Sequence, residues 1–209
     1  MNYYADGRPG GIFDFEIDEA GFGLWTLASH ADFLSGPRQK AYLDKVYPTI
    51  QVTADLLTKC RDATNGLQCP AEEDDNPGNL QTIHGASAVL AGLKGAVRAG
   101  RLMGEEASRL GAWEARVSEL EQAIVMEFYD KPGLGHFGGG TGAGAWLIWP
   151  TEFLPYEDAR IRSHSDYVFD EMLPFFQKKD HGAYFGKATA ALALLWKDDA
   201  ARRAKLEPV

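Results

Sequence analysis

The stretch DEAGFGLWTLASHADFL, residues 18–34, carries the clearest helical pattern in the chain. Its small and apolar side chains recur every three or four residues, as one face of an α-helix requires: Gly21, Leu24, Trp25 and Ala28. Asp18 stands where a helix N-cap is expected, because its carboxylate can accept from the unpaired N–H groups of the first turn. The stretch therefore predicts an amphipathic helix whose apolar face must be buried against a neighbour.

The same periodicity returns in later segments, and each of them predicts a helix. One runs to about residue 61, one begins at Thr82, others cover residues 110–128, 145–154 and 161–176, and the last begins near Lys187. Pro48 is expected to kink the helix that ends near residue 61, or to start a new one. No window shows the alternation of a strand, so the predicted fold class is all-α.

The spacing of these helices indicates an array of α-hairpins. The helices that open each pair begin near residues 19, 82 and 145, a period of about 63 residues. Loops within a pair are short and loops between pairs are long, so the long loops are expected at one end of the array. This predicted rim comprises residues 1–17, 62–81, 129–144 and 177–186, and such loops commonly carry a site. About three and a half hairpins fit in the chain, taken as a single domain over residues 1–209.

The composition limits the partners and the compartment. The formal net charge is -9, which argues against general nucleic-acid binding because that needs basic surfaces. No apolar run reaches the roughly 18 residues of a membrane helix, and the N-terminus lacks a secretory signal pattern, so a cytoplasmic protein is expected. Cys60 and Cys69 can pair in an oxidising compartment, but free thiols are expected. The GGGTGAG run, residues 138–144, lacks the ending of a phosphate loop, and no cofactor is implied.

The predicted rim contains an unusual acidic run. Within GLQCPAEEDDNPGNLQ, residues 66–81, four carboxylates follow one another: Glu72, Glu73, Asp74 and Asp75. Crowding of carboxylates is one way to keep a proton on one of them, as a general acid requires. Two other interpretations stay open. One is a solvated loop before a turn at residues 76–78, and the other is a cation site, although the run lacks the ligand spacing of an EF-hand.

Several stretches resemble, in order, segments of the glucoamylase family of six-hairpin (α/α) toroid glycosidases. They are FEIDEAGFGLW (15–25), YLDKVYPTIQVTADLL (42–57), residues 66–96, AIVMEFYD (123–130) and residues 146–173. Together they cover most of the chain. The resemblance implies an (α/α) hairpin toroid, complete or partial, that hydrolyses α-glucosidic bonds of oligosaccharides with inversion.

The chain departs from the glucoamylase pattern in three places. The early Arg-Asp pair of the family has no counterpart here, and no Glu matches the general base near the family's C-terminal end. The family's acid lies in a Trp-Glu-Glu core, where strict spacing places Asn76 and a shift of three residues places Glu73. These departures leave a fragment, a minimal relative or an inactive descendant open.

The resemblance implies roles for residues on the predicted rim. An inverting glycosidase needs one carboxyl that donates a proton and a second that activates water. Glu73 is the expected acid with Glu72 as the alternative, and Asp180 is a candidate for the base. Sugar contacts are expected from carboxylates, one histidine and stacking aromatic rings: Glu16, Asp18, Asp74, Asp75, His84, Trp146, Trp149 and Tyr184. No metal is expected. Each of these roles has a purely structural alternative. It is helix capping for Asp18, an exposed turn for Asp180 and core packing for the aromatic rings.

Two other functions stay open. A carbohydrate-binding relative without activity follows from the missing residues. An α-hairpin scaffold that binds protein is the second, and it predicts a large exposed apolar patch. An incomplete toroid also leaves hairpin flanks open, so a homo-oligomer is a further expectation.

Overall fold

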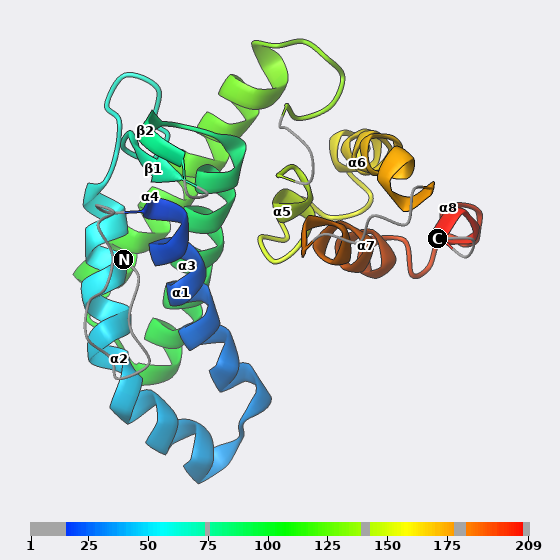
Figure 1. Cartoon of the computed structure of the whole chain (residues 1–209). Coiled ribbons are helices and arrows are strands. Elements are labelled where there is room, and N and C mark those ends of the chain that lie inside the picture. The colour runs from blue at the N-terminus through cyan, green and yellow to red at the C-terminus, as the bar shows by residue number, and fades with distance from the viewer. Residues whose placement is uncertain (1–15, 74–75, 139–142, 178–182, 207–209) are drawn as a thin grey trace. The chain divides into compact units, whose positions relative to one another are not determined.

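The computed structural model describes residues 16–73, 76–138, 143–177 and 183–206. The chain divides into two compact units, Met1–Ile124 and Val125–Val209 (Figure 1). Helices dominate both units, so the predicted all-α class is confirmed.

The first unit consists of two antiparallel helix pairs. The first pair is α1, Ile17–His30, and α2, Gly36–Lys59, with the 3-10 turn η1, Ala31–Phe33, between them. The second pair is α3, Ile83–Met103, and α4, Ala107–Ile124. The short links within each pair confirm the predicted hairpins, and α1 and α3 begin close to the predicted residues.

Glycine lets α1 and α3 approach closely. A Cβ on Gly92 would lie 2.6 Å from the backbone oxygen of Gly21, and a Cβ on Gly21 would overlap the backbone of Ala88. The contact surface around these glycines is apolar and fully buried, and it includes Leu24, Val89 and Leu93. Gly21 in α1 and Gly92 in α3 therefore permit the short distance between the two helices.

Pro48 lies inside the continuous helix α2, so the expectation that a new helix starts there is wrong. Proline removes one backbone N–H and leaves the carbonyl four residues earlier, that of Asp44, without its helical partner. Both residues are exposed, and water can therefore satisfy that carbonyl. The buried face of α2, which carries Leu43, Tyr47 and Ile50, continues unbroken past the proline.

Two short strands form where the sequence predicts only loop. β1, Ala71–Glu73, pairs antiparallel with β2, Asn76–Leu80, in the register Ala71 with Leu80 and Glu73 with Asn76. The hairpin lies at the end of the unit where α1 and α3 begin (Figure 1). An isolated parallel bridge also joins Glu16, just before α1, to Glu72 in β1. The strands are too short to show the periodicity by which a sequence reveals a strand.

The expectation of free thiols is also wrong. Cys60, at the end of α2, forms a disulfide with Cys69, and their Cα atoms lie 4.8 Å apart. The enclosed loop doubles back on itself through an antiparallel bridge between Arg61 and Gln68. This fold-back brings the two cysteines together.

The described residues of the second unit form five helical segments. They are the π-helical turn η2, Val125–Asp130; α5, Ala145–Ile148; α6, Ala159–Gln177; α7, Ala183–Leu195; and α8, Ala200–Leu206. The helix expected from Lys187 begins earlier, at Ala183, and α8 was not predicted. The core is built around Trp196, Met172, Phe169 and Ile161.

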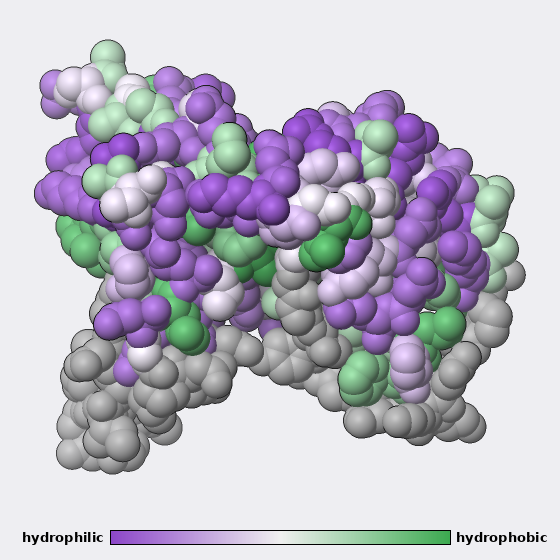
Figure 2. All heavy atoms as spheres, turned by 90° about the horizontal axis from the view of Figure 1, so that it is seen from above, coloured by the Kyte–Doolittle hydropathy of each residue, from purple (hydrophilic) through white to green (hydrophobic). Residues whose placement is uncertain are grey.

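Large exposed apolar side chains occur on several elements: Phe33 in η1, Val52 and Leu56 in α2, Leu102 in α3 and Leu194 in α7. The face drawn in Figure 2 is mostly hydrophilic, and its hydrophobic residues form small separate patches. Scattered exposure of this kind is normal for a protein surface. No helix among the described residues has the length and hydropathy needed to span a membrane.

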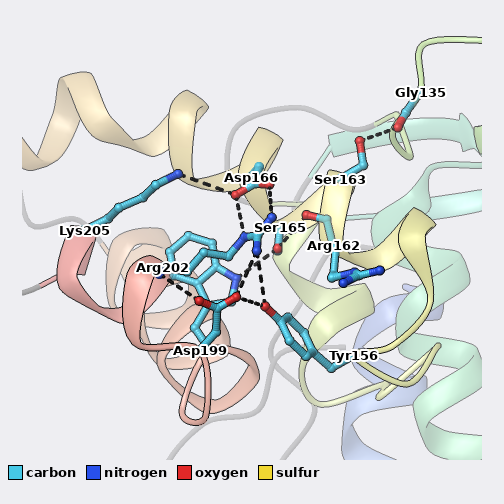
Figure 3. Close-up of polar contacts among 10 residues, drawn as sticks. Gly135, Tyr156, Arg162, Ser163, Ser165, Asp166, Asp199, Arg202 and Lys205 are labelled. Carbon is cyan, nitrogen blue, oxygen red and sulfur yellow. Dashed lines mark hydrogen bonds and ion pairs between the residues drawn. The ribbon is translucent and has the colours of Figure 1, made fainter.

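A network of charged side chains attaches α8 to α6 (Figure 3). The guanidinium of Arg202 donates to both carboxylate oxygens of Asp166, at 2.9 and 2.7 Å, and to Asp199 Oδ2 at 2.9 Å. The hydroxyl of Tyr156 donates to the same oxygen of Asp199. A forked arginine that bridges two carboxylates fixes geometry better than a single ion pair does. The last helix is thus held by polar contacts as well as by its apolar side.

Candidate functional site

The acidic run is accommodated because neighbouring residues of a strand face opposite ways. In β1, Glu73 is 1% exposed while Glu72 is half-buried, as the alternation of a strand requires. Two adjacent like charges are therefore separated onto different faces of the hairpin. Asp74 and Asp75 lie outside the described residues.

Glu73 lies against the start of α3, where it accepts hydrogen bonds from four donor groups. Gln68 Nε2 donates at 2.9 Å, the Gly85 N–H at 3.2 Å, and the Thr82 N–H at 3.2 and 3.3 Å to its two oxygens. The Thr82 hydroxyl donates as well. The first N–H groups of a helix have no partner within the helix, and they favour a negative charge. The hydrogen bonds to Glu73 thus hold the first turn of α3 against β1.

Gly85 is the residue that makes this approach possible. A Cβ at position 85 would overlap the carboxylate of Glu73. Thr82, the N-cap of α3, completes the turn because its hydroxyl oxygen accepts from the N–H groups of His84 and Gly85, at 3.1 and 3.4 Å. The Glu73 side chain and the first turn of α3 therefore fit closely together.

Glu72 and Glu16 form a second pair of carboxylates at the same end of the unit. Their backbones are joined by the parallel bridge, and bridged residues project to the same side at a separation of about 4.8 Å. Glu16 is 5% exposed. Glu72 Oε2 is buried and has no hydrogen-bond partner among the described residues.

Asp18 and His84 form a third contact at this end, between α1 and α3. Asp18 Oδ2 lies 3.3 Å from His84 Nε2, and the His84 ring lies 5.6 Å from that of Phe22. Glu16 and not Asp18 is the N-cap of α1, so the capping alternative for Asp18 is wrong. The chain enters the helix earlier than expected because Glu16 is tied to β1.

Five of the predicted site residues thus lie at one end of the first unit: Glu16, Asp18, Glu72, Glu73 and His84. They come from the segment before α1, from α1 itself, from β1 and from the first turn of α3. The sequence reasoning missed Gln68 and Thr82, which hold Glu73 in place. A threonine directly before a helical stripe is a capping signal, and it was available in the sequence. Gln68 carries no such signal.

The predicted aromatic residues belong to the second unit. Trp146 is 9% exposed, and the ammonium group of Lys187 lies 4.1 Å from the centre of its ring. Trp149 is partly buried and packs against the core. Tyr184 is part of α7, but its side chain lies outside the described residues, as does the whole of Asp180. Within the described part of the chain, no three His, Cys, Asp or Glu side chains converge as a metal site.

The chain matches no protein-family model and no curated protein sequence. Its structure is similar to that of a rhamnosidase from Klebsiella oxytoca with rhamnose bound, with a TM-score of 0.61 and 15% sequence identity. The similarity covers 93% of this chain and 37% of that chain. That rhamnosidase belongs to the six-hairpin toroid class of glycosidases. The present chain therefore has the fold of part of a toroid glycosidase, and it spans just over a third of that neighbour.

Proposed function

We propose that this chain is a glycoside hydrolase that cleaves α-glucosidic bonds of oligosaccharides with inversion, and that its first unit carries the proton donor. The observation that carries the proposal is the grouping of Glu16, Glu72, Asp18 and His84 at one end of the α-hairpins. Hydroxyl-rich ligands are bound by such buried carboxylate and imidazole groups because each offers a directed hydrogen bond.

Glu72 is better placed than Glu73 to act as the acid. A general acid must reach the leaving oxygen with its own proton. The Glu73 carboxylate is buried and already accepts from Gln68, Thr82 and Gly85. Glu72 is half-buried on the opposite face of β1, with one oxygen unpaired among the described residues. We assign Glu73 the role of anchoring the hairpin and Glu72 that of the donor.

The reaction follows from these roles. The Glu72 carboxyl gives its proton to the glycosidic oxygen as the bond from that oxygen to the anomeric carbon breaks. Water attacks the anomeric carbon from the opposite face and gives its proton to a second carboxylate. From the sequence, we propose Asp180 as this second carboxylate. Asp180 lies outside the described residues. The product is a sugar with the inverted anomeric configuration.

Two likenesses support a sugar substrate. The sequence stretches that resemble the glucoamylase family favour an α-glucoside. The rhamnosidase fold favours a glycosidase more generally, and rhamnose is the sugar bound in that neighbour. Because the fold alone is shared, α-glucosides and α-rhamnosides both belong in the test.

The test is sugar release from a panel of α-linked gluco-oligosaccharides and α-rhamnosides by the wild type and three variants. Glu72→Gln is expected to lower kcat by at least about 100-fold, since it removes the proton donor. Glu73→Gln is expected to lower stability and to retain activity in the folded fraction. Glu106→Gln, at the exposed link between α3 and α4, is the matched control and should behave as the wild type. Proton NMR of the first-formed anomer reports inversion or retention.

The assignment of the donor fails if Glu72→Gln keeps full kcat while folded Glu73→Gln loses it. Absence of turnover on every substrate contradicts hydrolysis. Saturable sugar binding by calorimetry in that case supports the second candidate, a carbohydrate-binding relative. The observation that favours this candidate is the complete engagement of Glu73, the residue closest to the family's acid segment, in helix capping.

A further inference from the structure

We propose that the Cys60–Cys69 disulfide positions the acidic hairpin, so that reducing it loosens Glu73 and Glu72 while the helices remain folded. We further expect the loosened hairpin to bind sugar more weakly, and this expectation rests on the function proposed above. The effect of the disulfide on the hairpin is independent of that function. Its basis is a continuous chain of contacts from the disulfide to the first turn of α3.

The disulfide ties the loop before β1 to the end of α2. The Cys69 N–H donates to the Cys60 carbonyl at 3.2 Å, and the Asp62 N–H donates to the Leu67 carbonyl at 3.0 Å. The strand β1 begins two residues after Cys69. The sulfur bridge thus determines where the chain enters the acidic hairpin.

Gln68, next to Cys69, connects the disulfide loop to Glu73. Its side chain is completely buried, and its amide donates to Glu73 Oε1 at 2.9 Å and to the Thr82 carbonyl at 3.1 Å. Gln68 therefore touches both the carboxylate and the N-cap of α3. A shift of the backbone at position 68 breaks both contacts together.

Gln81 closes the other side of the loop. Its amide donates to the Gln68 carbonyl at 2.6 Å and to Asp62 Oδ2 at 3.1 Å, and its own oxygen accepts from Asn65 at 3.1 Å. These bonds connect the disulfide loop to the residue directly before Thr82. The disulfide loop therefore supports both strands of the hairpin and the first turn of α3.

Arg116 of α4 explains why the helices should survive reduction. Its buried guanidinium donates to the carbonyls of Gly66 at 2.7 Å and Leu67 at 2.9 Å, and to Glu119 at 2.8 Å. These contacts hold the middle of the loop on α4 without any help from the disulfide. Reduction is therefore expected to free the loop near Gln68 and to leave the packing of α1 to α4 in place.

The chemical step is a two-electron reduction by a dithiol. The S–S bond breaks, each sulfur gains one electron and one proton, and the dithiol is oxidised to its cyclic disulfide. A structural disulfide persists in an oxidising compartment, so this inference differs from the cytoplasmic placement expected from the sequence.

The experiment compares amide hydrogen exchange in the oxidised protein, in the protein reduced with dithiothreitol and in the Cys60→Ser, Cys69→Ser double variant. The readout is the first turn of α3, where the N–H groups of Thr82 and Gly85 are protected by Glu73. Their exchange is expected to accelerate at least about tenfold on reduction and in the double variant. The amide of Val89, inside α3, is the internal control and should keep its protection. The double variant should not respond to dithiothreitol.

Two results would overturn the proposal. One is equal exchange at Thr82 and Gly85 in the oxidised and reduced proteins. The other is a parallel loss of protection at Val89, which would mean that the helices unfold together with the hairpin. Calorimetry with maltotriose is run on the same samples, and weaker binding after reduction is expected. If neither state binds maltotriose or any rhamnoside while the exchange difference is present, the proposed function fails and the role of the disulfide stands.

Discussion

Asp18 Oδ2 in α1 lies 3.3 Å from Nε2 of His84 in α3, and both side chains are more than nine-tenths buried. The two residues stand in the first turns of helices that begin at the same end of the first unit. A carboxylate removed from water needs a close donor, because burial of an unpaired charge is costly. The contact therefore contributes to the packing of α1 on α3 as well as to the candidate site.

Substitution of Asp18 tests this contact. Asp18→Ala is expected to lower the free energy of unfolding by about 3 kcal/mol, because it removes the buried carboxylate that contacts His84. Asp18→Asn keeps the shape and one acceptor, so its loss should be smaller. Urea unfolding of the two variants and the wild type measures the difference. Equal stability of all three would show that the contact contributes nothing to folding.

Gly85→Ala tests the close approach of Glu73 to α3. The added Cβ would overlap the carboxylate, so we expect a loss of about 2 kcal/mol in the free energy of unfolding. The matched control is Gly111→Ala in α4, where no atom of the described residues lies within 4 Å of the added Cβ. Alanine there should stabilise by up to about 1 kcal/mol, because it has the higher helix propensity. Opposite signs for the two substitutions in thermal or urea unfolding are the expected outcome.

Acid stability should depend on Glu105, at the link between α3 and α4. Its Oε2 accepts from Tyr47 at 2.7 Å and from Gln51 at 2.6 Å, which joins this link to α2. Burial on its own would raise the pKa of the Glu105 carboxyl, but these hydrogen bonds outweigh it and lower the pKa to about 2. A depressed carboxyl pKa stabilises the folded state above the unfolded value of 4.5, and this contribution is lost as the pH falls towards 2.

Unfolding of the wild type and of Glu105→Gln between pH 6 and pH 2 measures this contribution. The wild type should lose more stability than the variant over that interval, because only the wild type has the titrating group. Parallel curves for the two proteins would contradict the assignment. Glu106→Gln, at the adjacent exposed position, serves as the control and should follow the wild type.

His164 of α6 gives the second unit its own pH dependence. Its Nε2 donates to the Gly144 carbonyl at 2.8 Å, and its ring meets Phe137 edge to face at 5.5 Å. Complete burial outweighs the opposing bond to the Gly144 carbonyl and, together with the nearby His136, lowers the pKa of the imidazole to about 4. The unfolded chain binds the proton near pH 6.5 while the folded chain does not, so stability is expected to fall as the pH drops from 6.5 to 4.

The measurement is the unfolding of the second unit followed by near-ultraviolet circular dichroism from pH 7 to pH 4. His164→Gln, which cannot titrate, should remove most of the decline over this interval. Retention of the full decline in the variant would contradict the assignment to His164.

The helical fold was predictable because its signal is local. Spacing alone indicates a helix for pairs such as Leu24 and Ala28, or Val89 and Leu93. The helices α1, α3 and α5 begin close to the predicted residues. The site was predicted less well. Glu72 and Glu73 were recognised together as an acidic pair, but their different surroundings follow from a strand only three residues long. Gln68 was missed because its partners come from β1 and from the N-cap of α3, and no spacing in the sequence reveals them.

The sequence by itself determined the all-α class, the hairpin order and the position of the acidic run, because periodicity and turn residues act over a few neighbouring positions. Only the tertiary structure decided that Cys60 pairs with Cys69, that Glu73 accepts from the first turn of α3 and that Asp18 contacts His84. Those contacts join residues nine or more positions apart, beyond the spacing that helical periodicity reports. Their formation depends on how closely two helices approach, which the glycines at 21, 85 and 92 permit and the packing of the whole unit fixes.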